Sequence, residues 1–402
     1  MSHWKNFDFL NPSEEHKLLR NMVKSFVLSE VEPQAHKFDK AEKFNLELFK
    51  KLSDLGLCGI TVPEQYGGSG MDATAVVIAH EELSASDPGF CLAYLAHALL
   101  AANNLAVNGS ETQKEKYLPG LSNGSLVGAM AMSEPDYGTD VLGMKTTAAK
   151  QDDHYILNGR KMWITNGAID DNKTPCDFVW VYAKSGESNG RALISTFIVE
   201  KTDVGFYVGQ KITDKLGMRA SNTAELVFEN CKIPVSRLVG HEGDSMQHMM
   251  RNLEIERVGL AAMALGIARR SLEIMNKYAT ERISFGKPLN SYGQIQKYIA
   301  ESYAEFRAAQ CYVYETARRL NLTKEGNRLD SDGAKLVATT MSKNVADRAI
   351  QVLGGYGYVS EYVVERLWRD AKLLEIGGGT LEAHQKNITR DLAKIGFLKS
   401  EI

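Results

Sequence analysis

The sequence predicts an α+β fold in which a helical segment, an antiparallel β segment and a second helical segment follow one another. Residues 14–120 and 246–402 carry apolar residues at the 3.6-residue period of amphipathic helices, whereas residues 126–240 hold short β-branched and aromatic runs between turn signals. At 402 residues the chain exceeds the usual size of one domain. We therefore expect an N-terminal α-helical domain at 1–124, a middle β domain at 125–240 and a C-terminal α-helical domain at 241–402.

The N-terminal domain is predicted to contain several helices. One apolar stripe with helical spacing consists of Leu18, Leu19, Met22, Val23 and Phe26. A second consists of Leu48, Phe49, Leu52 and Leu55, and Gly56 directly after it is a typical helix stop. The glycine-dense residues 63–70 predict a loop, and residues 73–108 predict a further helical region.

The middle domain is predicted to be an antiparallel barrel or sandwich. Turn signals such as Asn158-Gly159 and Asn189-Gly190 separate the strand-like runs 154–157, 178–182, 194–199 and 226–228. Long amphipathic segments then return near residues 257–282, 294–320 and 332–353, and they predict the helical bundle of the C-terminal domain.

Composition and charge exclude several classes of partner. The net charge is −3 and Lys and Arg are spread along the chain, which argues against nucleic acid. The longest apolar run, 260–268, is shorter than the ~20 residues that span a bilayer, so we expect no membrane insertion. The nine histidines form no H-E-x-x-H pattern, and we expect no metal site. Five widely spaced cysteines and an N-terminus without a signal-peptide pattern favour a reducing compartment, and we expect the bacterial cytoplasm rather than the mitochondrial matrix.

Two segments of the predicted β domain suit a planar heterocyclic ligand. Residues 129–140 combine consecutive backbone amides, two hydroxyls and a turn fixed by Pro135 and Gly138, although an ordinary surface turn is the alternative. Trp163 and Thr165 lie two residues apart at the end of a strand and so face the same side, where an indole could pack on a ring while a hydroxyl bonds its edge. A core tryptophan is the alternative here.

Together these segments resemble the acyl-CoA dehydrogenase family. The resemblance continues through residues 215–223, 282–288, 351–357 and 369–372, and it covers almost the whole chain. Within the family it is greatest to the isovaleryl-CoA dehydrogenases, through residues 59–70, 113–119 and 374–380. The resemblance implies that family's fold, with its N-terminal helical domain, middle β domain and C-terminal helical bundle, and a homotetramer built as a dimer of dimers.

The same resemblance implies an FAD held without a covalent bond at a subunit interface. The residues carried over to the isoalloxazine and ribityl chain are Met130, Met132, Ser133, Thr139, Trp163, Ile164 and Thr165. Those carried over to the pyrophosphate and adenosine of a neighbouring subunit's FAD are Arg282, Phe285, Gln351, Gly354 and Gly355. Thr380 and Glu382 would complete the site. Position 293, where the family normally has a glutamine, is a glycine here, so either Gln294 substitutes after a local shift or that hydrogen bond is absent.

Desaturation beside a thioester needs a base for the α-proton and a hydride acceptor for Cβ. Most members of the family place a glutamate at the position of Gly378, which has no side chain, whereas the isovaleryl enzymes use a helical glutamate just before an arginine, as in Glu256-Arg257. We therefore predict Glu256 as the base; a solvated glutamate paired with Arg257 or a lysine is the alternative. Glu254 lies about 200° around the helix and would contact the CoA part instead.

The amide of Gly378 is predicted to bind the thioester carbonyl oxygen. By resemblance, the further contacts to substrate are assigned to Thr139, Glu254, Arg257, Gly378 and Gly379.

The predicted function is FAD-dependent α,β-dehydrogenation of a short, branched or cyclic acyl-CoA, with an electron-transfer flavoprotein as acceptor. Leu95 stands where isovaleryl enzymes usually have glycine, and Tyr137 adds bulk near the flavin, so the pocket should be narrow. Cys91 replaces the arginine of glutaryl-specific members, which disfavours a dicarboxylic substrate. The alternatives are dehydrogenation of another acyl-CoA (dicarboxylic or aromatic), an acyl-CoA oxidase, and a non-catalytic CoA-binding scaffold.

Overall fold

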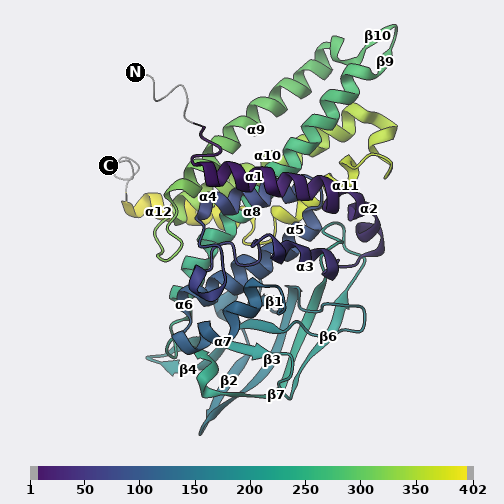
Figure 1. Cartoon of the computed structure of the whole chain (residues 1–402). Coiled ribbons are helices and arrows are strands. Elements are labelled where there is room, and N and C mark those ends of the chain that lie inside the picture. Colours follow the sequence, from purple (N-terminus) through teal and green to yellow (C-terminus); the bar gives the residue numbers. More distant parts are fainter. Residues whose placement is uncertain (1–7, 396–402) are drawn as a thin grey trace.

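The computed structural model describes residues 8–395, which form helices, then a β-sheet, then helices again (Figure 1). The N-terminal helical elements are α1 (Glu14–Phe26), η2 (Val27–Val31), α2 (Glu32–Ala41), α3 (Leu46–Asp54), η3 (Glu64–Tyr66), α4 (Ala73–Ser84), α5 (Pro88–Leu95), η4 (Ala96–Asn103), α6 (Asn104–Asn108) and α7 (Glu111–Ser122). The C-terminal ones are α8 (Ser245–Glu281), η7 (Leu289–Ser291), α9 (Gly293–Arg319), α10 (Arg328–Leu353), η8 (Gly354–Gly357), α11 (Val364–Leu374) and α12 (Leu381–Ile395).

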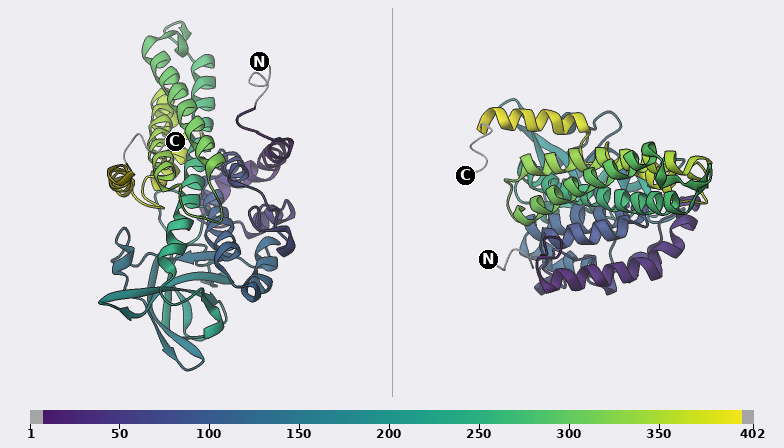
Figure 2. Two further views of the ribbon diagram at one scale, coloured as in Figure 1. Left: turned by 90° about the vertical axis from the view of Figure 1, so that its left-hand side faces the viewer. Right: turned by 90° about the horizontal axis from the view of Figure 1, so that it is seen from above.

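The strands between these helices form one twisted sheet (Figures 1 and 2). They are β1 (Gly128–Ala131), β2 (Thr147–Gln151), β3 (His154–Thr165), β4 (Phe178–Ser188), β5 (Arg191–Glu200), β6 (Phe206–Ile212), β7 (Thr223–Pro234) and β8 (Leu238–Val239), with the short helices η5 (Val141–Gly143) and η6 (Val235–Arg237). The strand order is β6-β7-β3-β2-β4-β5-β8, and β1 pairs with β4 beside this path. The β1–β4 and β2–β4 pairs are parallel, which the expected antiparallel pattern does not include, and the other pairs are antiparallel.

The N-terminal helices bury most of the two predicted apolar stripes, with Met22 and Leu55 partly buried and Leu18 exposed. On α1, Leu19, Val23 and Phe26 are buried, whereas Leu18 is 66% exposed, so its place in the stripe was wrong. The side chain of Ser13 caps this helix by accepting a hydrogen bond from His16 N. Residues Pro88–Asn108 form one helical stretch that is long and apolar enough to cross a membrane, but 83% of its most apolar window is buried inside the protein, as is usual for a core helix.

The C-terminal helices pack along α8, which at 37 residues is about 55 Å long. Helices α4, α9 and α10 all pack against it. Gly266 allows α4 to approach closely, because a Cβ at this position would overlap Ser84 Oγ and Glu81 O. Beyond this contact, α8 and α9 project together from the body and end in the two-stranded turn formed by β9 (Ile283–Ser284) and β10 (Lys287–Pro288) (Figures 1 and 2).

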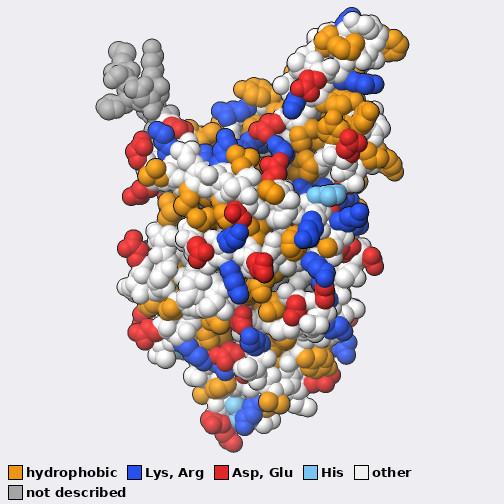
Figure 3. All heavy atoms as spheres, turned by 45° about the vertical axis from the view of Figure 1, so that its right-hand side comes forward, with side chains coloured by type: hydrophobic (Ala, Val, Ile, Leu, Met, Phe, Trp, Pro, Cys, Tyr) orange, Lys and Arg blue, Asp and Glu red, His pale blue; other side chains and the backbone are white. Residues whose placement is uncertain are grey.

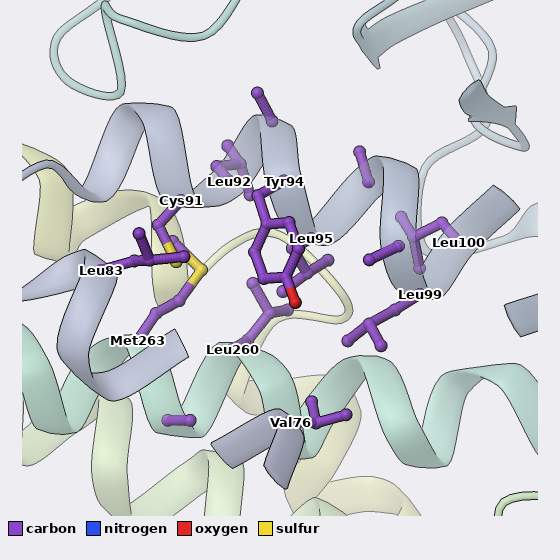
Figure 4. Packing of buried hydrophobic residues seen from close by; sticks show 14 of the residues in the cluster. Val76, Leu83, Cys91, Leu92, Tyr94, Leu95, Leu99, Leu100, Leu260 and Met263 are labelled. Atoms are coloured by element: carbon purple, nitrogen blue, oxygen red, sulfur yellow. The ribbon is translucent and has the colours of Figure 1, made fainter. Parts of the chain in front are cut away.

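The largest apolar core joins the N-terminal helices, the sheet and the C-terminal helices, and its part between the N-terminal helices and α8 bears on the site. Figure 4 shows Leu95 and Leu99 from the α5–η4 stretch pointing toward α8, with Leu260 near Leu95, while Met263 lies beside Leu83 and Cys91. This packing holds the middle of α8 against helices that precede the sheet in the sequence. The predicted boundaries after residues 124 and 240 lie between α7 and β1 and between β8 and α8, and they stay predictions.

Candidate active site

Glu256 lies in the buried part of α8, about three turns from its N-terminus. Only 7% of its surface is exposed, and its Oε2 has no hydrogen-bond partner within residues 8–395. Burial raises the pKa of this carboxyl group, and Arg257 and Lys335 oppose that rise. A buried carboxylate oxygen without a partner is costly, so it is a candidate to meet a ligand atom.

Gly378 lies directly beside this carboxyl group, in the loop between α11 and α12. A Cβ built on Gly378 would be 3.3 Å from Glu256 Oε1 and would overlap Leu260 Cδ1. The backbone of Gly378 has a φ of +66°, which also favours glycine. Glu256 and Gly378, 122 positions apart in the sequence, therefore share one small space, and a side chain at position 378 would not fit there.

Arg257 and Glu254, which are predicted to contact the substrate, both have partners within the chain. The guanidinium of Arg257 forms a buried ion pair with Asp332 on α10, with an N–O distance of 3.0 Å. The carboxylate of Glu254 accepts hydrogen bonds from the backbone N–H groups of Gly326 (3.0 Å) and Asn327 (2.9 Å), before α10. Glu254 thus holds a loop, and its contact with CoA stays a prediction.

The start of the sheet comes close to the same part of α8. Asn252, one turn before Glu256, lies 3.5 Å from the sulfur of Met130 in β1. Just after β1, Met132 and Glu134 are held by the fully buried Lys161 of β3. Its ammonium group donates to the carbonyl oxygen of Met132 and to the carboxylate of Glu134, both at 3.0 Å. The predicted cofactor segment 130–134 is therefore held by a buried ion pair on one side and touches α8 on the other.

Trp163 lies at an irregular point of β3. The β3–β7 register shifts between Lys161 and Ile164, and Trp163 has a φ of +67° and is 61% exposed. The predicted alternation of a regular strand therefore does not apply at this bulge, although Ile164 is buried and Thr165 is half-buried. Met162 N donates to Ser133 O at 2.9 Å, so the bulge is tied to the 130–139 segment, in which Thr139 is exposed.

The second predicted set of cofactor residues lies far from the first. Arg282 is 26 residues beyond Glu256 at the end of α8, about 39 Å along the helix axis. Together with Gly355 and Tyr356 it lines a cavity of about 460 Å³. Phe285, Gln294, Gln351 and Gly354 are exposed at this end of the molecule, and no atom lies within 4 Å of a Cβ built on Gly354 or Gly355. The two sets cannot surround one flavin within a single chain.

Both sets suit the parts of FAD that the resemblance gives them. Arg282 forms no ion pair with a carboxylate of the described residues, so its charge is available for an anionic group. The bare glycines beside it leave the backbone open to a ligand, and Trp163 offers an exposed aromatic face. Thr380 caps α12 by accepting from Ala383 N, beside the Gly378 loop, and Glu382 is exposed. Among the described residues no group of three or more His, Cys, Asp or Glu side chains could hold a metal ion.

Three family models match consecutive parts of the chain. Residues 13–125, 129–231 and 243–393 match the N-terminal, middle and C-terminal domains of acyl-CoA dehydrogenase, respectively. The mitochondrial isovaleryl-CoA dehydrogenase of Arabidopsis thaliana is 43% identical over 377 residues, which are 93% of this chain and 90% of that protein. The chain belongs to the acyl-CoA dehydrogenase family.

Solved structures of other acyl-CoA dehydrogenases share the whole fold. Butyryl-CoA dehydrogenase from Megasphaera elsdenii matches with a TM-score of 0.89 and 35% identity, covering 96% of this chain and 98% of its own. A glutaryl-CoA dehydrogenase from Mycobacterium smegmatis in complex with FADH2 matches with a TM-score of 0.89 and 30% identity over 97% of both chains. The predicted family, fold and enzyme class are therefore confirmed, and FAD is the cofactor.

Sequence reasoning missed three buried polar residues near Glu256, namely Asp332, Lys335 and His384. Asp332 and Lys335 stand three residues apart on the buried face of α10, among small and apolar side chains. Charged residues at buried positions of an amphipathic pattern are the signal that could have found them. His384 has no comparable signal, because only the fold brings it to Asp332.

Proposed function

We propose that this acyl-CoA dehydrogenase acts on a short, branched or cyclic acyl-CoA, and that Glu256 takes the α-proton. One observation carries the proposal: the buried carboxyl group of Glu256, with one oxygen unpartnered in the described part of the chain, lies beside Gly378, where no side chain fits. No carboxylate can therefore act from position 378, and the carboxyl group that reaches the same space comes from α8.

The chain's own residues provide the proton transfer and the polarisation of the thioester. Burial raises the pKa of Glu256 and so brings its basicity closer to that of a weak carbon acid, while Arg257 and Lys335 favour the ionised form. The N–H of Gly378 is proposed to donate to the thioester oxygen and stabilise the negative charge that develops there. When bound, FAD supplies the acceptor for the hydride of Cβ.

The proposed length of the acyl chain follows from the packing beside Glu256. Three residues farther along α8, a Cβ on Gly259 would lie 3.1 Å from Leu95 Cδ1 and 2.9 Å from Leu99 Cδ1. These two leucines close the space along the helix and favour a short acyl group. Cys91 is fully buried and uncharged, so it offers no partner for the second carboxylate of a glutaryl group.

The two separated half-sites support an assembly in which each FAD lies between subunits. We propose a homotetramer, built as a dimer of dimers, with the Arg282 end of one subunit reaching the Trp163 side of another. We also propose an electron-transfer flavoprotein as the acceptor. The bacterial cytoplasm stays the predicted location.

The test compares Glu256→Gln with the wild-type protein, both loaded with FAD. Anaerobic flavin reduction is followed by the loss of visible absorbance after mixing with isovaleryl-, isobutyryl-, butyryl- or glutaryl-CoA. Losing a general base is expected to slow the reduction at least roughly a hundredfold while FAD stays bound. Glu273→Gln changes an exposed glutamate of the same helix and should reduce at the wild-type rate.

Each alternative function has its own outcome in this experiment. Unchanged reduction in Glu256→Gln would refute the base assignment. Fastest reduction by glutaryl-CoA would refute the proposed substrate class, and no reduction by any thioester would favour the scaffold. Rapid reoxidation of the reduced protein by air would identify an oxidase.

A further inference from the structure

Lys335 on α10 is a fully buried lysine next to the proposed site. Its Nζ donates to the carbonyl oxygen of Gly379 at 2.8 Å and lies 3.1 Å from Nε2 of His384 on α12. A buried ammonium group needs hydrogen bonds and charge compensation to be tolerated. The mechanism above uses Lys335 only as a nearby charge, and its specific contacts with the glycine loop have no role there.

The direction of each hydrogen bond around His384 can be assigned. Its Nδ1 lies 2.5 Å from Oδ1 of Asp332, the carboxylate that also pairs with Arg257. A carboxylate only accepts, so Nδ1 carries the hydrogen and Nε2 accepts from Lys335. Nε2 also lies 3.0 Å from the Gly379 carbonyl oxygen, but in this tautomer neither of these two atoms can donate, and both accept from the Lys335 ammonium group. Burial lowers the pKa of His384 and so favours this neutral tautomer. Lys335 therefore has two of its three N–H bonds directed by fixed acceptors.

These contacts fix the loop that carries Gly378. Lys335 holds the carbonyl of Gly379, and a Cβ on Gly379 would lie only 3.0 Å from Cε1 of His384, so the loop packs directly on the imidazole ring. On its other side the loop meets Glu256 at Gly378. A displacement of the Gly379 carbonyl would move the adjoining Gly378 N–H relative to the base.

We propose that Lys335 is a positioning residue for dehydrogenation: its ammonium group fixes the Gly378–Gly379 segment through the Gly379 carbonyl and places a positive charge beside the Glu256 carboxylate. The inference rests on the proposed function, in which Glu256 is the base and the Gly378 amide binds the thioester oxygen. Its two parts, the hydrogen bond and the charge, can be removed separately.

Lys335 and Glu256 both lie among several charged groups. Those that face Lys335 are Glu256 and Arg257 on α8, Asp332 on α10, Glu375 after α11, and His384 on α12. Burial lowers the pKa of Lys335 to about 7, and Glu256 opposes this by favouring the ammonium form. Glu256 itself faces Arg257, Lys335 and the buried phenol of Tyr182 on β4. Removing the lysine charge should therefore raise the pKa of Glu256 and leave less of it ionised at neutral pH.

The experiment uses three variants of the full, FAD-loaded chain. Lys335→Gln keeps a donor for the Gly379 carbonyl but has no charge, whereas Lys335→Met removes both. Lys343→Met on the same helix is the control, because Lys343 makes no ion pair with the described residues. Anaerobic flavin reduction by the thioester that reduces wild type fastest is measured from about pH 6 to 9. Amide hydrogen exchange of residues 374–384 is measured by mass spectrometry on the same proteins.

The two Lys335 variants should separate charge from positioning. In Lys335→Gln we expect the pH profile to move about one unit toward alkaline pH, which lowers the rate about tenfold on the acidic limb of the profile, with recovery at high pH and unchanged amide exchange. In Lys335→Met we expect the same shift of the pH profile, but the rate should recover only in part at high pH. Amide hydrogen exchange at residues 377–379 should be about tenfold faster than in wild type. Lys343→Met should match wild type in both measurements.

The inference is overturned if Lys335→Met has the wild-type profile and the wild-type exchange. It is also overturned if neither Lys335 variant folds and retains FAD, because the lysine would then serve folding alone. The two proposals fail separately. A wild-type profile in Lys335→Met together with slow reduction in Glu256→Gln removes only the role of Lys335, whereas fast reduction in Glu256→Gln removes the base assignment.

Discussion

At the residue scale, the missing side chain of Gly378 leaves room for the carboxyl group of Glu256, the proposed base. Its backbone has a positive φ, and Leu260 Cδ1 occupies the space that a Cβ would need. Glu256 Oε1 lies 3.3 Å from the same point, so the carboxyl group that we propose as the base reaches this space from α8 rather than from the loop. Both the conformation and the packing therefore oppose any larger residue at position 378.

Replacing Gly378 by alanine should destabilise the protein as well as slow it. The strain of a left-handed backbone and the overlap with Leu260 together are expected to lower the free energy of unfolding by about 2 kcal/mol. Urea unfolding measures this change, and anaerobic flavin reduction measures the rate. Gly377→Ala is the matched control, because its Cβ would meet no atom closer than 3.6 Å. Equal losses in the two variants would contradict the special role of position 378.

At the scale of elements, His97 joins three parts of the fold. It lies in η4, donates from Nε2 to Leu121 O at 2.9 Å in α7, and accepts at Nδ1 from Gly128 N at 3.0 Å in β1. Because the Gly128 N–H must donate, Nδ1 cannot carry a hydrogen. The ring is therefore locked in its neutral form, and burial lowers its pKa to about 4.

Because the buried ring must stay neutral, we predict that lowering the pH reduces the free energy of unfolding through His97. The unfolded chain protonates His97 below about pH 6.5 but the folded chain only near pH 4, so the stability is full above pH 6.5 and is lost as the pH falls toward 4. His97 alone should contribute a slope of about 1.4 kcal/mol per pH unit in this window. Urea unfolding at several pH values measures the slope, which should be shallower by that amount in His97→Gln. The exposed His36, replaced by glutamine, should leave it unchanged, and an unchanged slope in His97→Gln would refute the prediction.

At the scale of the whole molecule, α8 and α9 project from the body, and a single chain leaves the end of this projection open to solvent. Charges of both signs are spread over the surface, while apolar side chains gather near the projecting end (Figure 3). Phe285 at the tip is 96% exposed, and Ile283, Tyr358 and Val359 nearby are also exposed. Exposed apolar groups beside a cavity lined by Arg282 suit an interface that closes over a bound ligand.

Phe285→Asp should weaken both assembly and FAD retention. A desolvated aromatic anchor typically contributes about 2 kcal/mol or more at an interface, so FAD is expected to bind about thirtyfold more weakly. Sedimentation velocity measures the assembly and fluorescence titration measures FAD affinity. Val204→Asp replaces another exposed apolar residue, in the turn before β6 and far from the tip, and should change neither. A tetramer that keeps its FAD after Phe285→Asp would contradict the shared site.

Local residue order was enough to predict the α-β-α sequence of elements and the family, and it selected Glu256 and Gly378 as candidates for the site. Helical and strand periods are properties of neighbouring residues, and spaced motifs are visible without coordinates. The misplaced Leu18, the two parallel strand pairs and the bulge at Trp163 could not be predicted in this way, because burial, register and irregularity depend on distant neighbours.

Only the tertiary structure decided how the residues of the predicted site are held relative to one another. Three of its contacts join residues that are far apart in the sequence. Leu260 fills the space at Gly378, Lys335 and His384 hold the glycine loop, and backbone amides hold Glu254. The distance of Arg282 from Glu256 likewise follows from one unbroken helix rather than from any motif. Such contacts arise when separate elements bury their surfaces against each other, which no local pattern encodes.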